Sequence, residues 1–150
     1  MNNRKEDYDI IKACDQGRKV LDAYWEYYRL IEPQLPESIK IFDSLYNPPY
    51  SMHDCLIVKS GFVDKNFHMD IDSSSGSCSV EKLTFINAEI VEKDSDLCLD
   101  NAYWVSNKIY LRGNKYEMHI LLTQQNNERA NMTIAFDDII IEGNWETNEA

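Results

Sequence analysis

The chain has 150 residues and a net charge of −11 at pH 7, with 43% hydrophobic and 11% aromatic residues. This length fits one domain, residues 1–150, built around a single core. The absence of an apolar run of about 20 residues excludes a membrane-spanning helix, and the negative charge disfavours direct nucleic-acid binding because it repels phosphates. Acidity suits a basic protein partner, although it also serves solubility alone.

The N-terminal sequence and the cysteines indicate a cytoplasmic protein. The start, MNNRKEDYDIIKACDQ, has no apolar stretch of the kind found in signal peptides. Cys14, Cys55, Cys78 and Cys98 stand far apart, with no C-x-x-C pair from which to build a zinc site. We therefore expect reduced thiols and no cofactor.

The helical part of the chain is predicted over about residues 6–46. Within Glu6–Glu32, apolar residues recur at the three- and four-residue spacing of one helix face. Pro33 ends this helix because proline has no amide hydrogen. A second short helix is predicted in LPESIKIFDSLY, where Pro36 suits a first-turn position, and the prolines of residues 47–49 end it.

The stretch YWEYY places aromatic rings around more than one face of the first helix. Trp25 and Tyr27 are the candidates for rings that lie outside the main core and contact a partner. The alternative is that the sheet and the second helix cover two sides of this helix.

His53 and Asp54 stand between the Pro48-Pro49 joint and the first strand-like run. An aspartate at a strand start can accept backbone hydrogens that the turn leaves unpaired, and the histidine can bridge helix and sheet. We interpret the pair as a structural clasp. A catalytic or ligand-binding role is the alternative.

The sheet part is predicted over about residues 53–143, where the apolar period changes to two. Gly113-Asn114 suits a turn between two strands, and Asp137-Asp138 breaks the last alternation, which indicates a bulge or a bend. A frayed tail is predicted at 144–150. The fold class is therefore α+β, with two N-terminal helices packed on one face of an antiparallel sheet of about six strands. The strand-like runs are DCLIVKSGF, FHMDID, VEKLTFINAEIV, YWVSNKIYLRG, KYEMHILLT and ANMTIAFDDIIIEG.

The order of these motifs resembles an uncharacterised bacterial family in which a hydrophobic-His-Asp step precedes an antiparallel meander. The similarity rests on "LP" before a short helix, "HD" opening a first strand, and then YWVSNKIY, YEMHILL and MTIAFDDIII. It covers most of the chain, and Met52 stands where leucine is expected. Small acidic proteins of this build also occur as immunity proteins beside bacterial toxins, an analogy of size and charge.

The candidate ligands for a metal site are His68, Asp70 and Asp72, which share one strand face, joined by His53 or Asp54 from the neighbouring strand. Strand geometry spreads these residues over roughly 13 Å, so one strand cannot supply all three ligands, and we expect a solvated outer face with no metal. The alternative function, a small enzyme or divalent-metal-binding domain, would use His53, Asp54, His68 and His119.

The function predicted first is that of a non-enzymatic acidic binding protein. In its most concrete form it is an immunity or inhibitor protein that covers the basic active site of a bacterial toxin such as a nuclease, with carboxylates standing in for phosphates. The sequence does not indicate an oligomeric state. The predicted partner-binding residues are Glu89, Glu92, Asp94, Asp96, Asp100, Trp25 and Tyr27.

Overall fold

The computed structural model describes residues 22–42, 52–75 and 79–143. The chain forms two compact units, Met1–Gln34 and Leu35–Ala150. The second unit contains the sheet and one helix, so the fold is α+β with a short helix and a large antiparallel sheet. None of the helices described is long and apolar enough to cross a membrane.

The described part of the first unit is a helix over residues 22–31 followed by the 3-10 helix η1, Glu32–Gln34. The helix stops two residues before Pro33, as its missing amide hydrogen predicts. Tyr24 and Tyr28 are buried, and each makes an edge contact with Trp25, with ring centroids 5.3 and 5.5 Å apart. The predicted helix before residue 22 lies outside the described residues.

The helix of the second unit is α2, Glu37–Phe42. The carbonyl of Pro36 accepts hydrogen bonds from the backbone N–H groups of Ile39 and Lys40, both at 3.1 Å, and so begins the helix. Ile39 and Phe42 are buried. Residues 43–46 of the predicted second helix lie outside the described residues.

In the described residues the sheet has eight strands in the order β4-β7-β6-β5-β1-β2-β3-β8, and every neighbouring pair is antiparallel. The prediction of about six strands is therefore wrong. The strands are β1 Leu56–Val63, β2 Asn66–Asp72, β3 Val80–Ile86, β4 Glu89–Lys93, β5 Tyr103–Arg112, β6 Lys115–Thr123, β7 Arg129–Phe136 and β8 Asp138–Gly143.

Two of the predicted strands are each divided by a bend, and this explains the count. β3 gives way to β4 at Asn87 and Ala88, and β7 gives way to β8 at Asp137. The β3–β8 ladder, which pairs Ile86 with Asp138, continues in the same register as the β4–β7 ladder. The segment formed by β3 and β4 and the segment formed by β7 and β8 are therefore two long antiparallel strands that bend together at one corner. This bend brings together β4 and β8, which stand at the two ends of the strand order.

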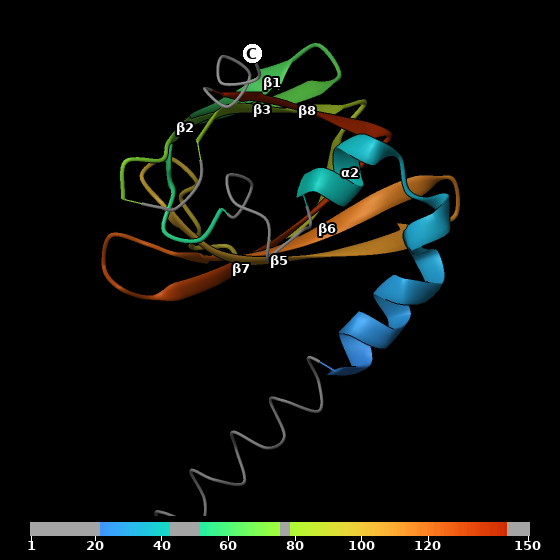
Figure 1. Cartoon of the computed structure of the whole chain (residues 1–150). Helices are drawn as coiled ribbons and strands as arrows, with labels where there is room; N and C mark the ends of the chain where they lie inside the picture. The colour runs from blue at the N-terminus through green and yellow to red at the C-terminus, as the bar shows by residue number, and fades with distance from the viewer. Residues whose placement is uncertain (1–21, 43–51, 76–78, 144–150) are drawn as a thin grey trace, which may run out of the picture. The chain divides into compact units, whose positions relative to one another are not determined.

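The bends divide the sheet into two facing layers, with β1, β3 and β8 in one and β5, β6 and β7 in the other (Figure 1). β1 and β5 join the layers through a short contact in which Leu56 pairs with Tyr103. Phe85 of β3 and Phe136 of β7 meet edge to face across the core, with centroids 5.1 Å apart. Fully buried side chains include Ile57, Met69, Leu83, Trp104, Ile109, Met118, Ile120, Leu122 and Ile134.

Helix α2 lies between the two layers (Figure 1). It packs against β8, where the Ser38 hydroxyl donates a hydrogen bond to Asp138. Phe42 meets the ring of Trp104, on β5, at a centroid distance of 5.8 Å. The helix described in this unit therefore lies between the layers, whereas the sequence predicted two N-terminal helices packed on one face of the sheet.

Candidate functional site

The predicted acidic stretch lies on β4 and the turn after it. β4 is at one end of the strand order and pairs with β7 alone. Glu89 and Glu92 belong to β4, and Asp94 and Asp96 follow it; all four side chains are exposed. We call these four residues the acidic edge. Their carboxylates line the border of the sheet rather than one side of a helix.

Glu92 and Asp94 face a hollow of about 300 Å³ on the outer side of β4, β7 and β6. Strand register sets its floor, because Glu92 pairs with Thr133 of β7, and Thr133 pairs with His119 of β6. The backbone N–H of Asn131 donates to Oδ2 of Asp94 at 2.7 Å, which fixes one carboxylate at the rim. The structure thus brings His119, from the alternative function, beside two residues of the acidic edge.

His119 is held by its own neighbours on this face. Its Nε2 lies 3.1 Å from Oε1 of Glu117, and its ring lies 4.5 Å from that of Tyr110. The Nε of Arg112 lies 3.5 Å from the same Glu117 oxygen. Glu117 is therefore shared by a guanidinium and an imidazole, which leaves the acidic edge as the uncompensated part of the face.

The acidic edge is not neutralised within the described residues, because none of its four carboxylates forms an ion pair there. Lys93 lies within the stretch and is exposed, but it too forms no ion pair with a described residue. Unpaired surface carboxylates at close spacing favour a cationic partner.

The other three predicted partner residues lie elsewhere. The carboxylate of Asp100 accepts a hydrogen bond from the hydroxyl of Ser60, on β1, at 2.8 Å, so it is tied to a different strand. Trp25 and Tyr27 belong to the helical segment of the first unit, where both side chains are partly exposed.

His53 and Asp54 stand just before β1. The Nδ1 of His53 donates to the carbonyl of Val105 at 2.9 Å, and the backbone N–H of Asp54 donates to the carbonyl of Trp104 at 2.8 Å. Asp54 has a φ of 68°, a left-handed conformation that aspartate tolerates better than most residues. Both side chains are exposed, and their 3.5 Å contact lies at the surface. Both residues are therefore hydrogen-bonded to β5 just before β1 begins. Their role as a structural clasp that stabilises this joint stays a prediction.

A second hollow, of about 450 Å³, opens on the outer face of β1, β2 and β3. It contains His68 and Asp70, which the sequence placed on a solvated face, together with Lys59, Gly61 and Lys82. Sequence reasoning missed these last three. Their grouping depends on pairing between distant strands, and the available signal was a glycine inside a strand-like run, which often marks a close approach.

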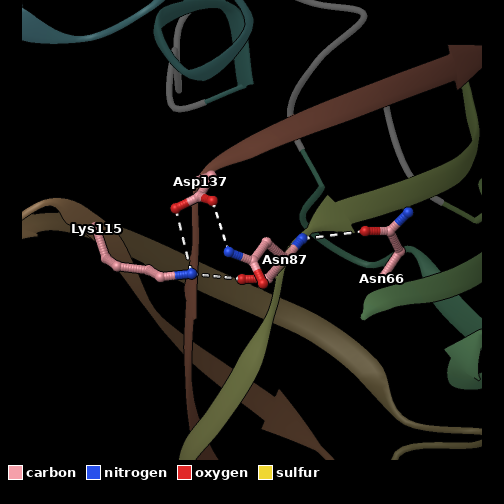
Figure 2. Close-up of polar contacts among 4 residues, drawn as sticks. All are labelled: Asn66, Asn87, Lys115 and Asp137. Carbon is pink, nitrogen blue, oxygen red and sulfur yellow. Dashed lines mark hydrogen bonds and ion pairs between the residues drawn. The ribbon is translucent and has the colours of Figure 1, made fainter. Parts of the chain in front are cut away.

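Figure 2 shows a polar network at the corner where the long strands bend. The Nδ2 of Asn87 donates to Asp137 at 2.8 Å, and Nζ of Lys115 lies 3.2 Å from the same carboxylate while donating to the carbonyl of Asn87 at 2.7 Å. Asn66 accepts from the backbone N–H of Asn87 at 3.0 Å. The hydrogen bond from Asn87, followed by that from Lys115, lowers the pKa of Asp137.

Possible metal ligands and cysteines are distributed as follows in the described residues. These residues contain no group of three or more His, Cys, Asp or Glu side chains placed to hold a metal ion. Cys55 is buried and Cys98 is exposed. Cys14 and Cys78 lie outside the described residues.

A comparison with known protein families shows which family the chain belongs to. Residues 4–135 match the family described as "Protein of unknown function (DUF4085)". The chain belongs to this family. The match spans the acidic edge and both hollows, and its description assigns no activity. No curated protein and no solved structure gave a significant match.

Proposed function

We propose that the protein is an acidic binding protein that uses the acidic edge to engage a basic protein. In its most concrete form it is an inhibitor or immunity protein in the bacterial cytoplasm, which covers the basic active site of a toxin such as a nuclease. The observation that carries this proposal is the set of four exposed carboxylates with no ion pair among the described residues. Carboxylates presented in this way can occupy positions that phosphates take on a nuclease.

The position of the acidic edge supports the same proposal. Among the strands that the structure describes, β4 has a neighbour on one side only, so its other side can offer backbone groups to a partner beside the carboxylates. The adjoining hollow can accept a lysine or arginine side chain between Glu92 and Asp94. Charge steers the encounter, and the edge and hollow then provide fixed contacts.

The alternative, a small enzyme or metal-binding domain, requires His53, Asp54, His68 and His119 to converge. In the described residues each histidine has a different partner: His53 bonds to Val105, His68 to Thr84 and His119 to Glu117. We therefore favour binding over catalysis.

Association kinetics test the proposal. The chain is co-expressed with the product of the adjacent reading frame, and association rates are measured at low and high salt. We expect Glu92→Lys with Asp96→Lys to slow association by about tenfold or more at low salt, since the reversed charges repel a basic surface. Asp94 is left intact because its carboxylate bonds to the backbone of Asn131.

The matched control is Glu81→Lys with Glu142→Lys. These exposed residues lie on β3 and β8, and the change in net charge is the same. The control should slow association much less if the acidic edge is the contact surface. The absence of any complex, or an association rate that ignores salt and the reversal at Glu92 and Asp96, would sink the proposal.

A further inference from the structure

The hollow on the outer face of β1, β2 and β3 lies apart from the acidic edge and has a different chemistry. Its depth comes from Gly61 of β1, which pairs with His68 of β2. A Cβ built on Gly61 meets no atom within 4 Å, so the space above this residue is open. The missing side chain leaves a gap in the row of outward-facing groups.

Positive charge gathers around this gap. Asp70 pairs with Lys59 on one side and with Lys82 on the other, and both lysines line the hollow. Neither lysine forms an ion pair with Asp70 or another described residue. Two ammonium groups and one carboxylate line the hollow, and Glu142 of β8 pairs with Lys82 at its border, so the two lysines are the groups that can hold an anion here.

His68 adds an oriented donor to the site. Its Nδ1 is hydrogen-bonded to Oγ1 of Thr84 at 3.1 Å, and Thr84 is buried. This bond fixes the ring, and Nε2 makes no hydrogen bond with the described residues. A fixed imidazole beside two lysines is an arrangement that binds an anionic oxygen.

The side of the hollow formed by the end of β1 is apolar. Val63 lies on the same face of β1 as Gly61 and lines this side, and its side chain is 62% exposed. Large exposed apolar side chains beside a polar pocket are typical of a small-molecule site.

We propose that this hollow binds a small organic anion, a carboxylate or a phosphate monoester with a short apolar body. The anionic group lies between Lys59, Lys82 and Nε2 of His68, and the apolar body lies over Gly61 against Val63. This site goes beyond the proposed function, because it uses the other layer of the sheet and none of the residues of the acidic edge.

Titration of the whole chain with phenyl phosphate and benzoate, followed by NMR, tests the site. Saturable shifts at Gly61 and His68 are expected for either anion, and their relative affinities tell a phosphate site from a carboxylate site. Inorganic phosphate should bind more weakly because it lacks the apolar body. Benzylamine, a cation of similar shape, should bind at least about tenfold more weakly than the better anion.

Gly61→Val is the decisive variant. The open space above Gly61 accepts the larger side chain, and valine favours a strand, so the melting temperature should not fall. The added methyl groups occupy the space above residue 61 where the apolar body would lie, and the affinity for phenyl phosphate or benzoate should fall by about tenfold or more.

A second pair of variants tests the charge independently of the fold around Gly61. Lys59→Gln with Lys82→Gln should weaken binding to a similar degree, whereas Lys93→Gln with Arg129→Gln removes the same charge from β4 and β7 and should leave it unchanged. Failure to saturate with either anion, tighter binding of benzylamine, or anion binding that survives both Gly61→Val and the Lys59 and Lys82 changes would overturn the proposal.

Discussion

Asn87 and Asp137 face each other where the two long strands bend from one layer into the other. Asn87 has a φ of 49°, in the left-handed region that asparagine tolerates better than most residues. Asp137 donates its backbone N–H to the carbonyl of Ile86 at 2.9 Å, and its side chain joins Asn87 to Lys115. A single carboxylate thus connects both bends to the β5–β6 turn.

Acid should therefore weaken this corner. The folded-state pKa of Asp137 is lowered, so the stability it contributes is present above the unfolded value of about 3.9 and is lost as the pH falls through the folded value. We expect Asp137→Asn to lower the urea midpoint at pH 7, and the difference from the parent to shrink at pH 3.

The control for this measurement is Asp96→Asn. Its carboxylate accepts no hydrogen bond from the described residues, so the midpoint should change little at either pH. An Asp137→Asn midpoint that stays equally far below the parent at both pH values would show that the carboxylate charge is not what stabilises the corner.

At the scale of elements, the two layers are joined through aromatic contacts as well as through the bends. Phe85 of β3 and Phe136 of β7 are fully buried, and their rings meet at an interplanar angle of 71°. Edge-to-face pairs of this kind add about 0.5–1.5 kcal/mol beyond the burial of their area.

A double-mutant cycle should detect this coupling. We expect Phe85→Leu and Phe136→Leu each to lower the free energy of unfolding, and the double variant to lose about 0.5–1.5 kcal/mol less than the sum of the two single losses. Urea denaturation at pH 7 supplies the free energies. Strict additivity would mean that the layers are held together without this pair.

The strands themselves could be predicted, but only one of the two bends that divide them could. All six strand-like runs contain strands, because alternation reports which face is buried. The break at Asp137 was visible in the sequence as an interrupted alternation. The bend at Asn87 was not, since a polar residue inside a strand also occurs on a solvated face; only its tolerance of a positive φ gave a signal.

At the scale of the whole molecule, a net charge of −11 opposes compaction through self-repulsion. Salt screens this repulsion, so we expect the melting temperature to rise between about 20 and 200 mM sodium chloride. Glu92→Lys with Asp96→Lys should reduce the rise, and so should Glu81→Lys with Glu142→Lys, because the effect follows total charge. A melting temperature that falls with salt would contradict this.

The candidate sites show the same limit of sequence reasoning at larger scale. The acidic edge could be predicted because its members are close in sequence, from Glu89 to Asp96. The hollow above Gly61 could not, because Lys59, Asp70 and Lys82 become neighbours only through the register of three strands. Contact between distant residues is set by pairing, which composition and periodicity do not specify.

The shared register of the long strands has a consequence for how the chain folds during synthesis. The β1–β2 and β5–β6 hairpins join residues close in sequence and can form early. The β3–β8 ladder joins Ile86 to Asp138 and Val80 to Gly143, so β3 must wait for the last strand to leave the ribosome. Until then its edge stays open to other nascent chains, and the interval before β8 arrives is when this protein is most prone to aggregate.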